Sequence, residues 1–429
     1  MSGLMLFAFL FLLAMSVPVA ISIGLGSTAA VFGTDNLSMI VIAQQLFIAI
    51  DKYPLAAIPF FILAGNLMET GGISRRLVDF AKSIIGGIQG GLACSCVLTC
   101  MIFASVSGSS VATTFAIGAI LIPALVKHAY PRNYAAALQA SSAELGVIIP
   151  PSIPMILYGV SAEVSIGELF IAGFGPGLLI GVALIIYVWL YAKFKGYGKQ
   201  DHEGRLSFGV ATQKASFALL MPVVILGGIY GGIFTPTEAS VVAVFYALIV
   251  GFFIYRELTL KALIPVLKKS VISSAVIMFI IATAGLFSFL ISRAGIPEAL
   301  GSWLTEVLKS PGWFLLGVNV ALFIIGMFIE TSASIIILAP ILVPIAIQFG
   351  IDPVHFGLIM VVNLALGMIT PPFGVNLFAA CAVARISLDK IIPPLLGFVG
   401  VIIACLMLIT YVPDISLFLR DWVYASPAQ

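Results

Sequence analysis

Two pairs of adjacent prolines constrain this chain more than any other feature, because each pair interrupts an apolar segment. The first pair lies in the middle of residues 144–159, which read ELGVIIPPSIPMILYG. Proline lacks the backbone N–H that a helix needs, and its ring clashes with the preceding turn. In hydrocarbon a freed carbonyl finds no water, so such a break is tolerated only where protein or a polar cavity surrounds it. The prolines therefore predict a helix that is broken for a functional reason.

The composition predicts an all-α polytopic membrane protein. Of the 429 residues, 61% are hydrophobic and 9% are charged, whereas a soluble domain carries about a quarter charged residues. Residues 4–32 form a charge-free run that is longer than the roughly 20 residues of a spanning helix. No basic segment precedes this run and it is longer than a signal-peptide core, so we expect a retained span.

The remaining polar residues exclude several classes of protein. The cysteines all fall in apolar runs without a metal-binding spacing, and we expect neither a disulfide nor a metal site from Cys94, Cys96, Cys100, Cys381 and Cys405. The histidines are isolated, and the sequence has no nucleotide-binding glycine loop and no nucleophile elbow. The net charge of +2 comes from a few loop residues. We therefore expect no enzymatic activity, no nucleotide and no nucleic-acid partner.

The distribution of basic residues predicts the topology, because cytoplasmic loops are enriched in lysine and arginine. The loops at 193–214 and 256–269 are basic and are separated by two apolar spans, so both are placed in the cytoplasm. The apolar segment 88–127 has basic residues on both sides. It should therefore enter and leave on the cytoplasmic side as a hairpin, with the polar sequence SVSGSS at its tip.

The order of a polar hairpin tip followed by a proline-broken segment occurs again 221 residues later in the chain. SGSSVATTFAIGAILIPAL at 107–125 corresponds to FIETSASIIILAPILVPIA at 328–346, and ELGVIIPP at 144–151 corresponds to ALGMITPP at 365–372. The second hairpin, 312–348, lacks a basic excess at its ends, and the charge pattern places those ends outside. These features predict an inverted-topology repeat, which is typical of secondary transporters.

The broken helices and hairpin tips together predict a binding site. A broken helix exposes carbonyls to a cation, and its half-helix N-termini offer N–H groups to an anion. Sodium prefers oxygen ligands, and the two tips and breaks supply hydroxyl, carboxylate and amide oxygens: Ser107, Ser109, Ser110, Glu330, Thr331, Ser332, Ser334, Thr370 and Asn376. The alternative for a single proline is a packed kink, and the alternative for the whole chain is an ion channel lined by the serine-rich tips.

Four motifs resemble the large membrane subunit of tripartite ATP-independent periplasmic (TRAP) transporters. They are FFILAGNLMETGGISRRLVDFA, FASVSGSSVATTFAIGAILIPAL, GGIYGGIFTPTEAS and MITPPFGVNLF. The resemblance implies an elevator-type transporter in the bacterial inner membrane that imports an organic acid, such as sialic acid or a C4-dicarboxylate, together with sodium. It also implies two partners: a periplasmic substrate-binding protein and a small four-helix membrane subunit, which we expect to be a separate chain.

The resemblance also assigns binding residues, position by position. Sodium site 1 would join the tip of the first hairpin to the first break, through Ser107, Ser109, Ser110, Gly146, Val147 and Pro150. Sodium site 2 would comprise Glu330, Thr331, Ser332, Ser334, Gly367, Thr370, Pro371, Gly374 and Asn376. The substrate would contact Ser109, Ser152, Ser332 and Asn376.

We divide the chain accordingly into scaffold and transport segments. Residues 1–87 and 196–310 are predicted as scaffold spans with arms, and residues 416–429 as a C-terminal tail. Residues 88–195 form transport repeat 1, with hairpin 1 (88–127) and broken helix 1 (132–160). Residues 311–415 form transport repeat 2, with hairpin 2 (312–348) and broken helix 2 (353–384). Outside these repeats, Glu238 is expected to cap a helix, and Arg293 to reach the membrane interface from a span end.

Overall fold

The computed structural model describes residues 2–34, 37–198, 206–308 and 310–424, and these residues form helices and loops without a strand. Eight of the described helices are long and apolar enough to cross a membrane, or up to ten if each of two bent helix pairs counts as one span. Lys199 and Arg205 of the predicted basic loop, and residues 425–429 of the predicted tail, lie outside the described residues. The all-helical membrane class predicted from composition is confirmed.

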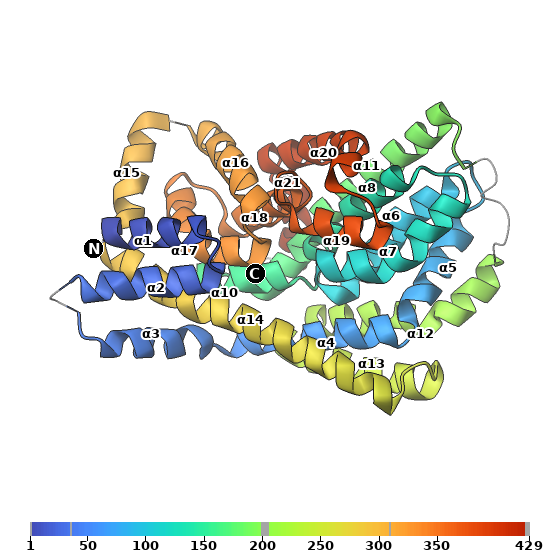
Figure 1. Cartoon of the computed structure of the whole chain (residues 1–429), viewed down its shortest axis with the longest axis horizontal. Helices are drawn as coiled ribbons and strands as arrows, with labels where there is room; N and C mark the ends of the chain where they lie inside the picture. The colour runs from blue at the N-terminus through green and yellow to red at the C-terminus, as the bar shows by residue number, and fades with distance from the viewer. Residues whose placement is uncertain (1, 35–36, 199–205, 309, 425–429) are drawn as a thin grey trace, which may run out of the picture.

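The N-terminal apolar run is not one span. Residues 4–32 contain two helices, α1 (Ser2–Ala14) and α2 (Val19–Phe32), which pack side by side (Figure 1). The turn between them contains Ser16 at a φ of 62° and ends at Pro18, which precedes the first residue of α2. The expectation of a single span was wrong because hydropathy does not detect a turn made of uncharged residues.

The first transport repeat follows the predicted order. Hairpin 1 consists of α6 (Gly91–Ser107) and α7 (Ser110–Lys127). Broken helix 1 consists of α8 (Arg132–Ala143), α9 (Leu145–Ile148) and α10 (Ile153–Ala162), with a bend of 41° at the prolines. The long helix α11 (Ile166–Lys195) then completes the repeat.

The second repeat has the same order of elements. Hairpin 2 consists of α16 (Pro311–Phe328) and α17 (Thr331–Gln348), and broken helix 2 of α18 (Pro353–Met368) and α19 (Val375–Ala384). Both proline pairs adopt a cis peptide bond. The repeat ends in α20 (Leu388–Tyr411), and the predicted tail begins inside α21 (Asp414–Tyr424), which packs against α11.

The two repeats exchange contacts at their centres. The second helix of each hairpin packs against the last half-helix of the other repeat, so α7 contacts α19 and α17 contacts α10. Figure 1 shows α6 and α7 on one side of this centre and α16 and α17 on the other. The four segments that carry the predicted binding residues therefore converge.

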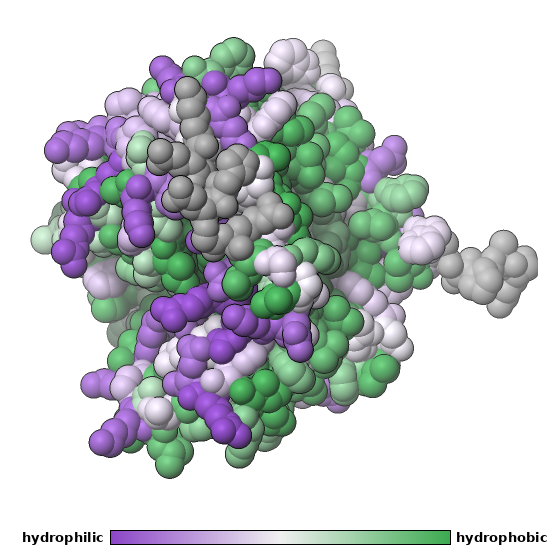
Figure 2. Space-filling model, turned by 90° about the vertical axis from the view of Figure 1, so that its right-hand side faces the viewer, coloured by the Kyte–Doolittle hydropathy of each residue, from purple (hydrophilic) through white to green (hydrophobic). Residues whose placement is uncertain are grey.

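Most of the remaining helices, among them the long diagonal helix α14, lie along the lower side of the repeats in Figure 1, whereas α15 lies at the upper left beside α16 and α5 lies at the right. The remaining helices are α3 (Ile40–Ile50), η1 (Tyr53–Ala56), α4 (Ala57–Thr70), α5 (Ile73–Ile85), α12 (Phe208–Tyr230), α13 (Pro236–Ile249), the π-helical turn η2 (Val250–Ile254), α14 (Leu260–Arg293) and α15 (Ile296–Leu308). Helix α5 and the ends of α11 and α12 lie at the right in Figure 1, and Figure 2 shows that hydrophilic residues gather on that end of the molecule.

Two predictions outside the repeats can be judged directly. Glu238 forms a capping box at the start of α13, because its carboxylate accepts the Thr235 N–H at 2.8 Å while Thr235 Oγ1 accepts the Glu238 N–H at 3.2 Å. The predicted cap is confirmed. Arg293 lies exposed in the last turn of α14, where its side chain can reach the interface.

An ion pair attaches α21 to the start of α18. Arg420 Nη1 donates to Asp352 Oδ2 at 2.7 Å, and Asp352 Oδ1 accepts the N–H groups of Val354 and His355. Partial burial raises the pKa of Asp352, but the hydrogen bonds from Arg420 and from the His355 N–H outweigh it, and the pKa lies below its usual value of 3.8. The ionised form of Asp352 is therefore stabilised by folding.

We expect Arg420→Gln to destabilise the protein by about 1 kcal/mol at neutral pH, because the lost ion pair is only partly buried. A lowered folded-state pKa gives stability that is present above the usual value and lost as pH falls through the folded value. The difference in Tm between the variant and the unmodified protein should hold above about pH 5 and shrink below about pH 4. A difference that persists unchanged at the lower pH would contradict this assignment.

Candidate functional site

The tip of hairpin 1 is a two-residue turn between α6 and α7. Gly108 has a φ of 62°, a left-handed conformation that favours glycine. Ser109 follows as the N-cap of α7, and its hydroxyl accepts the Ala112 N–H at 3.4 Å. The serines and glycine of this motif therefore make the sharp turn and leave the N-terminus of α7 at the centre of the protein.

This tip lies directly against the break in broken helix 1. The Ile153 N–H donates to Gly108 O at 3.3 Å. A Cβ atom added at Gly146 would lie 2.7 Å from Thr113 Oγ1 and 2.8 Å from Ser109 O, so only glycine allows this approach. The predicted association of the tip with the break is present in the structure.

The other residues predicted for sodium site 1 lie around this junction. Ser107 Oγ is 3.0 Å from Thr113 Oγ1. Ser110 Oγ is buried and interacts with the Glu144 carboxylate, although it makes no close hydrogen bond among the described residues. Val147 O accepts the Ser152 hydroxyl at 2.5 Å, and Ser152 Oγ in turn caps α10. Val147 O is thus engaged within broken helix 1 and the Ser110 hydroxyl lies at the start of α7, and the role of both in binding sodium stays a prediction.

The tip of hairpin 2 carries a carboxylate at the equivalent position. Glu330 is the N-cap of α17, where its Oε2 accepts the N–H groups of Ser332 at 2.9 Å and Ala333 at 3.2 Å. Glu330 Oε1 accepts the Ser332 hydroxyl at 2.8 Å. At an offset of 221 Glu330 corresponds to Ser109, so the two repeats place different N-cap residues at the same point.

Hairpin 2 also meets the break in its own repeat. Gly326 and Gly367 pack backbone to backbone, and a Cβ atom on Gly367 would overlap the Gly326 carbonyl carbon. Thr331 Oγ1 lies 2.9 Å from Met368 Sδ. The break itself, residues 369–374, is tightly turned, because a Cβ on Gly374 would lie 2.5 Å from Met368 O.

Three further residues of predicted site 2 lie near the second break or tip, and two of them donate hydrogen bonds to backbone carbonyls of their own segments. The Thr370 hydroxyl donates to Leu366 O at 2.8 Å and the Ser334 hydroxyl to Ile329 O at 3.5 Å. Pro371 lies partly exposed at the break. The ligand roles of these three residues stay predictions.

Asn376 differs from the other residues of predicted site 2, because its side chain is directed at repeat 1. Its Oδ1 accepts the Thr114 hydroxyl at 2.6 Å, and its Nδ2 donates to Glu144 Oε1 at 2.7 Å and to Ala140 O at 3.1 Å. Neither Glu144 nor Thr114 was predicted from the sequence. A carboxylate inside an apolar run was the available signal for Glu144, because such residues are rare and usually functional in membrane segments.

The four residues predicted to contact substrate fall into separate places. Ser109 and Ser152 flank the first junction, Ser332 lies at the second tip, and Asn376 is fully buried between α7 and α8. No hydrogen bond joins Ser332 to the other three among the described residues. A common substrate site for these four side chains stays a prediction.

The cysteines and the other metal-binding side chains were also predicted to form no site. All five cysteines are buried and free in the structure. Within the described residues, no group of three His, Cys, Asp or Glu side chains is placed to hold a metal ion.

The chain matches a known family along nearly its whole length. The family of the DctM component of tripartite ATP-independent periplasmic transporters matches residues 6–415. This chain belongs to that family. It is therefore a transporter permease subunit, and the resemblance found in the four sequence motifs is confirmed.

Several relatives of this DctM-family permease are closely similar. The C4-dicarboxylate TRAP transporter large permease protein DctM of Pseudomonas aeruginosa is 44% identical over 93% of each chain. The sialic acid TRAP transporter large permease protein SiaM of Vibrio cholerae is 36% identical over 90% of this chain and 91% of that one. The isethionate TRAP transporter permease protein DctMQ of Oleidesulfovibrio alaskensis is 43% identical over 92% of this chain, which spans 62% of that longer protein.

The fold of the permease is also found in a solved transporter. The crystal structure of the Alcanivorax borkumensis YdaH transporter matches with a TM-score of 0.60 at 16% sequence identity, over 89% of this chain and 87% of that chain. At this identity the likeness concerns the fold alone. The predicted fold class is confirmed as an all-helical polytopic membrane protein with broken helix pairs, similar to that transporter.

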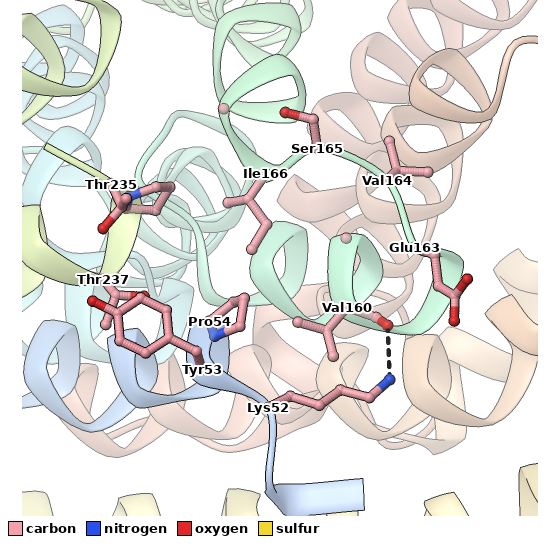
Figure 3. Close-up of a pocket in the computed structure, with 13 residues that line it drawn as sticks. Lys52, Tyr53, Pro54, Val160, Glu163, Val164, Ser165, Ile166, Thr235 and Thr237 are labelled. Atoms are coloured by element: carbon pink, nitrogen blue, oxygen red, sulfur yellow. Dashed lines mark hydrogen bonds between the residues drawn. The ribbon is translucent and has the colours of Figure 1, made fainter. Parts of the chain in front are cut away.

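A cavity of about 520 Å³ lies away from both junctions, between the permease's repeat 1 and the helices along its side (Figure 3). Tyr53 and Pro54 of η1 and the Thr235–Thr237 segment line one side, and Val160 and Glu163 near the end of α10 line the other. Lys52 Nζ donates to Val160 O at 3.4 Å across this boundary, as Figure 3 shows. A second cavity of about 340 Å³ shares Lys52 and Val160 and extends toward α14 and α17.

Ser110 allows a test of the first junction in this permease. Its buried hydroxyl makes no close hydrogen bond among the described residues but interacts with the Glu144 carboxylate, so Ser110→Ala should cost at most about 1 kcal/mol of stability. If the hydroxyl binds cargo, the change should raise the half-saturating concentration of sodium or substrate about fivefold, for a contribution near 1 kcal/mol. Initial uptake rates at varied sodium and substrate would measure this, and unchanged curves would show that Ser110 binds neither.

Proposed function

We propose that this chain is the translocating subunit of a sodium-coupled importer of an organic acid. The high identity to a C4-dicarboxylate permease over 93% of both chains supports a C4-dicarboxylate as the first candidate substrate, with sialic acid as the second. The driving force would be the sodium gradient and the membrane potential, where one elementary charge moved through 100 mV contributes roughly 2.3 kcal/mol. No nucleotide would be consumed.

The observation that carries the proposal is the junction of a hairpin tip with a helix break, present once in each repeat. At the first junction, Ser109 O, Thr113 Oγ1 and Gly146 lie in close contact. At the second junction, Glu330 caps α17 at the hairpin tip, and the next residue, Thr331, contacts Met368 just before the break. Unwound backbone and hydroxyl oxygens of this kind suit sodium, and half-helix N-termini suit the carboxylate of a substrate.

We propose an elevator mechanism in which the two repeats move against the scaffold segments 1–87 and 196–310. The cross-packing of α7 with α19 and of α17 with α10 supports the two repeats moving together, because these contacts join them into one packed body. The two cavities beside Lys52 lie on the boundary between this body and the scaffold segments. The likeness to the YdaH fold supports the architecture, and inverted topology of the repeats is part of the same proposal.

The proposed partners are a periplasmic substrate-binding protein and a small membrane subunit, with the complex in the bacterial inner membrane. A relative whose printed name joins M and Q in one longer chain supports the second partner, since this chain spans 62% of that protein. Exposed apolar side chains on α3, including Ile40, Phe47 and Ile48, offer a surface for lipid or for that subunit.

The test is reconstituted transport. Proteoliposomes that contain this chain and its small partner should take up a C4-dicarboxylate only when sodium and the cognate binding protein are present outside, and without ATP. Sialic acid serves as the comparison substrate. Uptake should saturate with substrate concentration, whereas a channel would conduct without the binding protein.

Two results would count against the proposal. Robust uptake in sodium-free buffer, at constant pH and potential, would exclude sodium coupling. Labelling of single cysteines placed at positions 85 and 305 from the same side of the membrane would exclude the inverted repeat. Neither result would alter the membership of the family.

A further inference from the structure

One buried cluster joins the two repeats beside both predicted sodium sites. Asn376 of α19 accepts a hydrogen bond from the Thr114 hydroxyl of α7 at 2.6 Å and donates to Glu144 Oε1 at 2.7 Å. The Thr114 and Asn376 residues are 0% exposed and Glu144 is 2% exposed. We name Thr114, Asn376 and Glu144 the inter-repeat clamp.

Each member of the clamp stands close in sequence to a predicted ligand segment. Thr114 lies one helical turn after Ser110, at the start of α7. Glu144 lies two residues before Gly146, at the start of the first break. Asn376 lies two residues after Gly374, at the end of the second break. The clamp therefore connects α7 and the first break, which carry site 1, to the start of α19, which follows the second break.

We propose that the inter-repeat clamp couples the two sodium sites, so that sodium bound at one raises the affinity of the other. Thr114 and Glu144 would act as positioning residues, because they hold the amide of Asn376, which is itself among the predicted ligands of site 2. This inference rests on the proposed function, because it needs two sodium sites at the two junctions.

The physical argument concerns which segments must be ordered for binding. Sodium at site 1 would hold the 107–110 tip against the 146–150 break, which fixes the relative positions of Thr114 and Glu144. Thr114 and Glu144 bond the Oδ1 and Nδ2 atoms of Asn376, so the first turn of α19 is then held in place. Because α19 begins directly after the second break, the residues of site 2 would already be ordered when the next sodium ion binds. Coupling of this kind is a free energy shared between the two sites.

A second buried amide cluster provides the matched control. Asn319 Nδ2 donates to Thr410 Oγ1 at 3.1 Å, and Asn363 Nδ2 donates to Asn319 Oδ1 at 2.6 Å. Thr410 is 1% exposed. These three residues all belong to repeat 2, on α16, α18 and α20. Loss of the Thr410 hydroxyl therefore removes its hydrogen bonds with Asn319 Nδ2 and Leu406 O without touching the connection between the repeats.

The experiment compares initial uptake rates against sodium concentration for Thr114→Val, Thr114→Ser and Thr410→Val in the complete reconstituted transporter. The unmodified chain should give a sigmoidal curve whose Hill coefficient lies between that of independent sites and the upper limit of about 2 for two sites. Thr114→Val keeps the shape of threonine but removes its donor, so the Hill coefficient should fall below that of the unmodified chain and half-saturating sodium should rise about fivefold. Thr114→Ser keeps the donor and should behave like the unmodified chain, and Thr410→Val should keep the sigmoidal curve.

Several outcomes would overturn the coupling. A hyperbolic sodium curve for the unmodified chain would do so, as would an undiminished Hill coefficient in Thr114→Val. An equal loss in Thr410→Val would show that any buried hydrogen bond in the transport body has this effect. Sodium-independent uptake by the unmodified chain would instead overturn the proposed function and the coupling together. Where a variant does not transport, its sodium dependence can be compared with that of the unmodified chain through the shift of Tm with sodium concentration, measured on purified protein.

Discussion

Gly146→Ala and Gly367→Ala are each expected to raise half-saturating sodium by roughly tenfold to a hundredfold, because each inserts a methyl group where a hairpin tip touches a helix break. The Cβ at position 146 would lie 2.7 Å from Thr113 Oγ1 and 2.8 Å from Ser109 O, and the Cβ at 367 would overlap the backbone of Gly326. Overpacking of this kind costs about 1–3 kcal/mol. Here the cost falls on the tip–break contact itself, since backbone atoms cannot turn away as a flexible side chain can. Initial uptake rates against sodium would measure the change.

Gly317→Ala is the matched control for this prediction. Gly317 lies on α16, the helix that also contains Gly326, but a Cβ there would meet nothing within 4 Å. This variant should transport like the unmodified chain, and its helix should be slightly favoured because alanine forms helix better than glycine. If Gly146→Ala and Gly367→Ala retain normal sodium curves while folded, the two junctions are not where sodium binds.

The hairpins and breaks could be predicted from the sequence because proline and glycine have strong local effects. Hairpin 2 was placed at 312–348 and is found as α16 and α17, over Pro311–Gln348. Broken helix 2 was placed at 353–384, which are also the outer bounds of α18 and α19. The repeated proline pairs located both breaks, since the backbone lacks N–H groups there whatever the tertiary context.

Contacts between the repeats could not be predicted in the same way. Asn376 was placed among the ligands of site 2 because it follows the second break, but its amide is engaged by Thr114 and Glu144 more than 230 residues away. Such a contact depends on how α19 packs against α7 and α8, and nothing local in the sequence encodes it. The turn between α1 and α2 was missed for a different reason: uncharged residues there leave the hydropathy of the run unchanged.

The two repeats are also not chemically equal, although their backbones follow the same plan. The N-cap of α7 is Ser109 and the N-cap of α17 is Glu330, at the same position of the repeat. A serine hydroxyl and a glutamate carboxylate can both accept backbone N–H groups at a helix N-terminus. Only the carboxylate can add a negative charge at this buried position, where an isolated charge is costly unless a cation or strong donors compensate for it. This difference predicts that tip 2 depends on charge and tip 1 does not.

We expect Glu330→Ser to weaken sodium binding by roughly tenfold to a hundredfold. An interaction with a charged group contributes about 1.5–3 kcal/mol, and the variant would lose it. Serine is a good N-cap, so the variant gives tip 2 the N-cap residue that tip 1 already has and keeps the start of α17 capped. The Tm without sodium should therefore change little, while the increase in Tm on adding sodium should be reduced. Both quantities can be measured on the purified protein, independently of transport.

Glu330→Asp and Glu330→Ala separate the charge from the cap. Aspartate keeps both the negative charge and the ability to cap, so its sodium curve should lie closer to that of the unmodified chain than the serine variant does. Alanine loses both, and the N–H groups of Ser332 and Ala333 would lose the acceptor they now share, so both Tm and sodium affinity should fall. A Glu330→Ser variant with an unshifted sodium curve would mean that Glu330 only caps α17. The cation at that junction would then be held by backbone and hydroxyl oxygens alone, and the asymmetry between the repeats would have no part in coupling.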